Sequence, residues 1–165
     1  LNEQVQKWEH RGASVMVAKL SDQQVYADYF VGDGKPQHVE QIFYTELMNA
    51  DQCQMATLRQ ICLFMPTSPC FHQDCEPQCD VLDACAETLA IVYKQLQNSD
   101  LQMTVKFLAS YVGDLYKQGI LCMLQAGISV EPLNRKDWQA LVEPDHTRAW
   151  DSLLTNYAMQ SQFYI

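Results

Sequence analysis

The sequence predicts an α/β protein in which a single mixed five-stranded sheet is flanked by helices on both faces. Two alternating apolar segments lie close together near the N-terminus, and strand-like and helix-like segments then alternate along the chain. A hairpin followed by βα units gives a sheet with both antiparallel and parallel pairs. No internal repeat or Pro/Gly/Ser-rich linker divides the 165 residues, so we expect residues 1–165 to form one domain.

The N-terminal part predicts the hairpin and a first helix. The segment GASVMVAKL (12–20) alternates between apolar and polar residues and is rich enough in β-branched residues for a strand. A turn separates it from a second strand, VYADYFV (25–31). After a loop with glycine and proline, apolar residues recur at helical spacing from residue 38 to about residue 49.

The middle and C-terminal parts predict the βα units. LRQICLFMP (58–66) reads as a buried strand and leads through a loop into a long helix over 79–96, which we expect to begin near Pro77. The elements expected after it are a strand over 103–111, a helix over about 114–125 and a strand over 128–133. The remainder has the spacing of two amphipathic helices, whose tryptophans, Trp138 and Trp150, we interpret as core residues.

Charge and hydropathy limit the kinds of partner that this chain can be expected to bind. Eleven Lys and Arg against twenty Asp and Glu give a net charge of −9, and the basic residues are scattered rather than arranged as a stripe. Extensive gripping of duplex nucleic acid is therefore not expected, while a single-stranded or small-molecule substrate fits. No apolar run approaches the roughly 18–20 residues that span a bilayer, so no membrane partner is expected. The oligomeric state is left open.

Seven cysteines are many for a cytosolic enzyme. If two bind metal, the other five allow two disulfides and one free thiol, with Cys122 as a candidate for the free one; the alternative is that all five are small core residues. Cys53 and Cys62 can pair only if the intervening loop folds back on the strand. Cys79 and Cys85 lie too far apart along one helix to pair with each other.

One arrangement of residues indicates chemistry. His38-Val39-Glu40 opens a predicted helix, and Pro69-Cys70-x4-Cys75 precedes the next one, with a buried strand between them. One imidazole and two thiolates leave the fourth tetrahedral position of Zn²⁺ for water, which is typical of catalytic rather than structural zinc. Glu40 lies two residues after His38 on the predicted helix and points to another side, so it should not bind the same metal ion directly. In the first turn of the helix its carboxyl can still face the metal-bound water and act as a general acid/base. This arrangement resembles the H-x-E…P-C-x-x-C signature of zinc-dependent nucleobase deaminases, with four residues rather than two between the cysteines.

The sequence resembles the AID/APOBEC polynucleotide cytidine deaminases. The resemblance rests on HVEQIF, on FMPTSPCFHQDC, on the stretch KFLASYVGDLYKQGILCMLQAGISVEPLNRKDW and on HTRAWDSLL, and it runs from about residue 12 to 157. It implies a cytidine-deaminase-like fold, zinc as cofactor, and the ligands His38, Cys70 and Cys75, with Glu40 as the proton shuttle. Cys79 is an alternative to Cys75, but the four-residue gap fits the family better.

The same resemblance implies a substrate and a set of contacts to it. The family deaminates cytosine to uracil in single-stranded polynucleotide, with a zinc-activated water attacking C4. Thr67, Ser68 and Tyr111 are the candidate substrate contacts: Thr67 stands where the family usually has tryptophan, and Tyr111 follows a strand, where it either stacks on a base or packs. The sequence pI of about 4.7 is lower than in the basic members.

Two other functions and two locations fit the sequence. The charge and the missing tryptophan favour a deaminase of free cytidine or nucleotides, and the spare cysteines are also compatible with a catalytically silent, secreted, zinc-stabilised binding protein. The chain begins at Leu1 without a signal-peptide profile, so either a leader was removed or the chain was trimmed. The cysteines and this start resemble a secreted branch of the family, which predicts an extracellular location, with the cytoplasm as the alternative.

Overall fold

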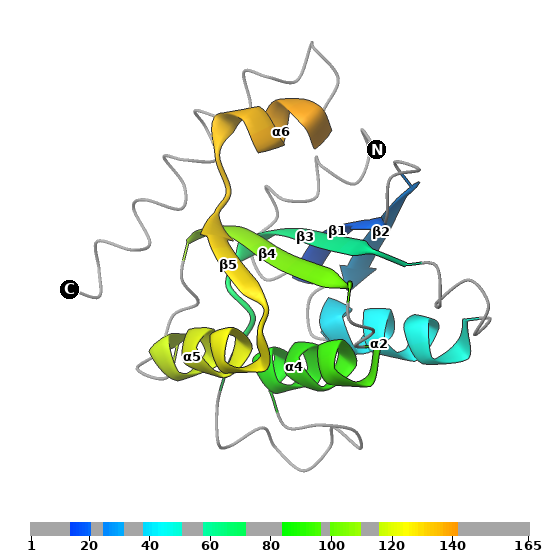
Figure 1. The fold of residues 1–165 in the computed structure, drawn as a ribbon. Coiled ribbons are helices and arrows are strands. Elements are labelled where there is room, and N and C mark those ends of the chain that lie inside the picture. The colour runs from blue at the N-terminus through cyan, green and yellow to red at the C-terminus, as the bar shows by residue number, and fades with distance from the viewer. Residues whose placement is uncertain are drawn as a thin grey trace.

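A computed structural model of the chain shows an α/β fold with a mixed sheet (Figure 1). The residues that it describes are 14–20, 25–31, 38–50, 58–71, 84–96, 100–109 and 116–141. Within them the strands are β1 (Ser14–Leu20), β2 (Val25–Val31), β3 (Gln60–Thr67), β4 (Gln102–Ala109) and β5 (Ser129–Pro132). The helices are α2 (Val39–Asn49), α4 (Cys85–Leu96), α5 (Tyr116–Ala126) and α6 (Arg135–Leu141).

The described strands form one sheet in the order β2-β1-β3-β4-β5. Strand β1 pairs antiparallel with both β2 and β3, with Ser14 opposite Val31 in the first pair and Val17 opposite Phe64 in the second. Strands β3, β4 and β5 run parallel to one another. The carboxyl ends of these parallel strands therefore lie at one edge of the sheet, the edge at which α/β proteins place their ligands.

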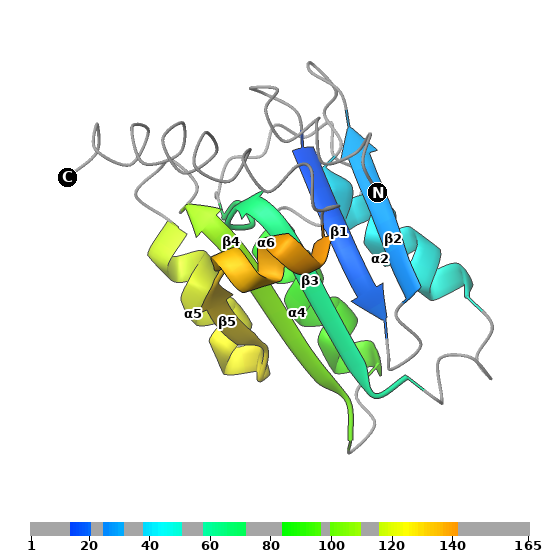
Figure 2. The same ribbon diagram turned by 90° about the horizontal axis from the view of Figure 1, so that it is seen from above.

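Helices cover both faces of the sheet, as the sequence predicts. Helices α2, α4 and α5 lie side by side on one face, and α6 crosses the other (Figures 1 and 2). Strand β3 serves both layers, because successive side chains of a strand point to opposite faces. Ile61, Leu63 and Met65 belong to the main core cluster, whereas Cys62 and Phe64 are buried outside it.

The main core lies between the sheet and the three helices. Its members are apolar residues at helical spacing on the helices and at every second position on the strands. Helix α5 ends where Gly127 adopts a positive φ of 94°, and the amide of Ile128 donates to the carbonyl of Met123 at 3.0 Å, a left-handed cap that turns the chain into β5. This turn brings β5 back beside β4.

Helix α6 is held against the sheet by one buried tryptophan and one charged cluster. Trp138 is fully buried. Lys106 of β4 donates to Asp137 of α6 at 2.9 Å and pairs with Glu131 of β5 at 3.2 Å. The side-chain oxygen of Asn134 accepts from the amide of Lys136 at 2.9 Å and caps the helix.

The described elements lie within a few residues of those predicted from sequence. The helix predicted over 79–96 differs in its first residue, because the described helix is Cys85–Leu96. Residues 72–83 lie outside the described part of the chain. The second C-terminal helix, with Trp150, also lies outside it. Trp138 is a core residue, as predicted. None of the described helices has the length and hydropathy to span a membrane.

The four described cysteines, Cys62, Cys70, Cys85 and Cys122, are free thiols. The conditional pairing of Cys62 with Cys53 is therefore wrong: Cys62 lies on the central strand β3, where it is buried among sheet residues. That burial raises the pKa of the Cys62 thiol to about 11. Cys122 is a free, half-buried thiol, as the sequence predicts for the odd cysteine. Cys53, Cys75 and Cys79 lie outside the described residues.

Candidate metal centre

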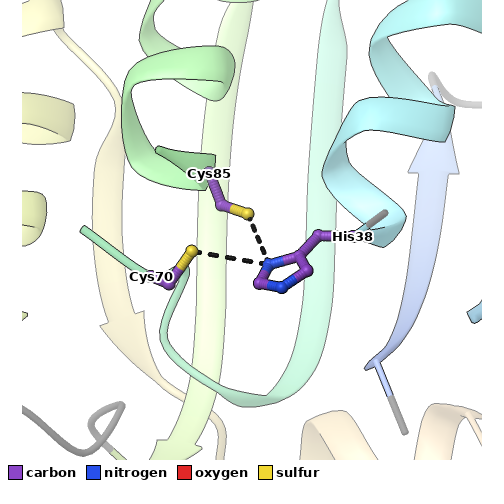
Figure 3. Close-up of side chains that lie close together, drawn as sticks. All are labelled: His38, Cys70 and Cys85. Carbon is purple, nitrogen blue, oxygen red and sulfur yellow. Dashed lines mark hydrogen bonds between the residues drawn. The ribbon is translucent and has the colours of Figure 1, made fainter. Parts of the chain in front are cut away.

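A cluster of one histidine and two cysteines lies where β3 ends and where α2 and α4 begin. His38 immediately precedes α2, Cys70 follows β3, and Cys85 is the first residue of α4. Figure 3 shows the three side chains pointing toward one another from these segments. The potential ligand atoms lie within 4.8 Å of one another, so that the three residues form a group that could hold a metal ion.

Local hydrogen bonds fix the backbone of His38 and join the Cys70 segment to the start of α4. The amide of His38 donates to the side-chain oxygen of Gln41 at 3.2 Å, and the amide of Gln41 donates to the carbonyl of His38 at 3.1 Å. These bonds satisfy the start of α2 and leave the imidazole directed at the sulfurs. The amide of Ala86 donates to the carbonyl of Cys70 at 3.1 Å, which ties the segment after β3 to the first turn of α4.

The distances suit a tetrahedral metal with nitrogen and sulfur ligands. His38 Nδ1 lies 2.9 Å from Cys85 Sγ and 3.4 Å from Cys70 Sγ. Ideal zinc bond lengths put a tetrahedral N–S edge at about 3.5 Å. The cluster therefore has to open by only a few tenths of an ångström, on the order of 0.1–0.6 Å, to accept Zn²⁺. Both thiols are buried, and the two thiolates would balance the charge of a divalent ion.

The two thiols of the cluster differ in their pKa values. A hydrogen bond from the Cys85 thiol lowers the pKa of Cys70 to about 4, despite the opposing effect of burial. The same hydrogen bond raises the pKa of Cys85, and burial raises it further. A hydrogen bond with Cys70 raises the pKa of His38. At neutral pH the cluster thus already contains one thiolate, a good metal ligand, with a second thiol beside it.

Glu40 lies beside this cluster, although it is two residues from His38 on the same helix. Only 5% of the residue is exposed, and its Oε2 has no hydrogen-bond partner among the described residues. Burial raises the pKa of its carboxyl, against a smaller opposing effect of a hydrogen bond with the Cys85 thiol. A buried carboxyl oxygen without a partner is costly. Because Glu40 lies beside three potential metal ligands, its Oε2 can accept a hydrogen bond from a water or a substrate group in the site.

The structure brings together three of the four residues predicted for the centre, His38, Glu40 and Cys70. It adds Cys85, one of the five cysteines for which the sequence predicts a disulfide, a free thiol or a core position. Cys75, predicted as the third ligand, lies outside the described residues, and its assignment stays a prediction. No spacing in the sequence singles out Cys85 as a ligand, because its place beside Cys70 comes from the packing of α4 against the segment after β3.

Two of the predicted substrate contacts lie next to the cluster in sequence. Thr67 ends β3 and is half-buried, and Ser68 is buried, with its amide donating to the carbonyl of Ala109 at 2.9 Å. This bond extends the β3–β4 pairing up to the residues that precede Cys70. The third predicted contact, Tyr111, lies outside the described residues.

Comparisons with known proteins give distant structural likenesses. The sequence matches no protein-family model and no curated protein. The diaminohydroxyphosphoribosylaminopyrimidine deaminase/5-amino-6-(5-phosphoribosylamino)uracil reductase of Thermotoga maritima superposes with a TM-score of 0.45 at 19% identity, over 71% of this chain and 29% of that one. A C-terminal deletion mutant of the Rib2 deaminase of Aspergillus oryzae superposes with a TM-score of 0.43 at 14% identity, over 76% of this chain and 75% of that one.

Proposed function

We propose that this chain is a zinc-dependent hydrolytic deaminase that converts cytosine to uracil in single-stranded polynucleotide. The observation that carries the proposal is the buried Glu40 carboxyl beside one imidazole nitrogen and two cysteine sulfurs. Zinc sites with three protein ligands of this kind are typical of catalysis, because the fourth position is left for water.

His38, Cys70 and Cys85 are the residues that would hold the zinc. When bound there, Zn²⁺ would lower the pKa of a water to about 7 and so supply the nucleophile at neutral pH. The two thiolates would neutralise the ion, so no further buried counter-charge would be needed. The N-termini of α2 and α4 both face the cluster, and their dipoles favour the ionised sulfurs.

Glu40 would move the proton. Its carboxyl takes a proton from the attacking water and passes it to the amino group on C4 of the base. The C4–O bond forms, the C4–N bond breaks, and the amino group leaves as ammonia, so cytosine and water give uracil and ammonia. The burial of the carboxyl excludes bulk water that would compete for this proton.

The position of the metal centre favours a base that is neither stacked nor paired with another base. The two thiols and the Glu40 carboxyl are buried at the carboxyl edge of the parallel strands, so a stacked base in a duplex could not reach them. A single-stranded substrate meets this requirement at little cost in unstacking. The net charge of −9 favours a second candidate, free cytidine or a cytidine nucleotide, because few basic residues are present to hold a long phosphate backbone.

A deamination assay on single-stranded DNA, single-stranded RNA and cytidine tests the function, with the Glu40→Gln variant as the control. We expect turnover by the wild type, and a loss in the variant of roughly 10²–10⁴-fold, the usual contribution of a general acid/base. Zinc content should be the same in both proteins. Equal turnover by both would refute the mechanism, and preference for cytidine would favour the free-nucleoside function.

Stoichiometric zinc with no turnover on any of these substrates would leave the catalytically silent binding protein. Secretion remains part of the proposal as the expected location. Mass measurement of the isolated protein with and without reductant tests it, since a fully reduced chain under non-reducing conditions counts against secretion.

A further inference from the structure

Gly119 of helix α5 lies close to the two segments that carry the cluster's cysteines. This residue is buried, and a Cβ atom built on it would lie 2.9 Å from the Cβ of Phe71 and 3.3 Å from the Cβ of Ala86. Carbon atoms in ordinary contact lie about 3.5–4.0 Å apart. Both neighbours are Cβ atoms, which are fixed to the backbone and cannot rotate away, so only glycine allows this approach.

The two atoms that Gly119 approaches belong to the residues that directly follow Cys70 and Cys85. Phe71 continues the segment after β3, and Ala86 lies in the first turn of α4. The amide of Ala86 also donates to the carbonyl of Cys70. The backbones that carry the two cysteines are therefore bonded to each other and lie together against α5.

We infer that Gly119 is a positioning residue for the metal centre, an inference that rests on the function proposed above. The close approach that it permits sets the separation of the two sulfurs. A methyl group at this position pushes Phe71, and with it Cys70, away from α5 and from the first turn of α4. Glycine is a poor helix former, so its presence inside α5 is a cost that this packing explains.

The test is the metal affinity of the Gly119→Ala variant, measured by competition with a chromophoric chelator. The expected result is a zinc affinity roughly 10–100-fold weaker than that of the wild type, the range found when residues that orient metal ligands are changed. Co²⁺ bound in place of zinc should show a shifted visible spectrum, since that spectrum reports ligand geometry. Gln118→Ala, an exposed change on the same helix, is the matched control and should leave both readouts unchanged.

A double-mutant cycle separates positioning from general packing. Phe71→Gly removes the Cβ atom with the closest contact, so adding Gly119→Ala to that background should change zinc affinity by no more than about threefold. A Gly119→Ala variant with unchanged affinity and cobalt spectrum would overturn the inference, as would loss of the metal-free fold, because the glycine would then serve packing alone. If the wild type itself binds no zinc, the proposed function fails instead.

Discussion

Replacing Cys85 by serine removes one sulfur from the cluster of His38, Cys70 and Cys85, whose potential ligand atoms lie within 4.8 Å of one another. The remaining pair, His38 and Cys70, offers one thiolate, so a divalent ion would keep a net positive charge in a buried site, which is costly. Changing residues that only orient ligands already costs roughly 10–100-fold in metal affinity. We therefore expect Cys85→Ser to weaken zinc binding at least about 100-fold, equivalent to about 2.8 kcal/mol.

The assay is zinc competition at fixed pH, with two matched serine variants. Cys122→Ser removes a half-buried free thiol that is not part of the cluster, and should bind zinc like the wild type. Cys75→Ser tests the ligand that the sequence spacing predicts. Wild-type affinity in Cys85→Ser together with loss of zinc in Cys75→Ser would refute the assignment of Cys85 and restore that of Cys75.

Three further perturbations test the surroundings of the centre. Zinc binding at pH 7 should release between one and two protons and strengthen as the pH rises. The reason is that the pKa values of Cys85 and His38 are raised, while Cys70, with a pKa of about 4, is already ionised. Calorimetry in buffers of different ionisation enthalpy measures the number of protons released, and no proton release would contradict the prediction. Gln41→Ala removes the hydrogen bond that fixes the amide of His38, and should weaken zinc binding by about tenfold in the chelator assay; unchanged affinity would show that the imidazole is held otherwise. Lys106→Met should lower the free energy of unfolding by about 1 kcal/mol in denaturant titrations at pH 7. Burial lowers the pKa of Lys106, but its two carboxylate partners raise it more. The stabilisation is therefore present below the unfolded pKa and is lost as the pH rises through the folded one, and a stability difference that does not fall over this rise in pH would contradict the ion pairs.

The fold was predictable because its signals are local. The alternation of 12–20 and 25–31, the apolar run of 58–66 and the helical spacing after residue 38 each depend on which side chains face a core, and each matches an element of the structure. The order of elements then favours the mixed sheet, since a hairpin pairs antiparallel and βα units pair parallel. The helix start near Pro77 and the second C-terminal helix lie outside the described residues and stay predictions.

The site was predictable only in part, because its third ligand, Cys85, is brought to the site by packing in space rather than by sequence spacing. His38, Glu40 and Cys70 stand next to helix starts and a strand end, which local patterns reveal. Cys85 comes to Cys70 through the packing of α4 on the end of β3, recorded in the hydrogen bond from the amide of Ala86 to the carbonyl of Cys70. A spacing motif counts residues between cysteines and carries no information about that contact.

X-ray absorption at the zinc edge of the purified protein tests the central claim most directly. We predict one zinc per chain with two sulfur neighbours at about 2.3 Å and two nitrogen or oxygen neighbours at about 2.0 Å, one of them from the histidine. The Cys85→Ser protein, loaded at high zinc concentration, should lose one of the two sulfurs. A shell of three or four sulfurs in the wild type, or a chain that binds no zinc, would contradict the account.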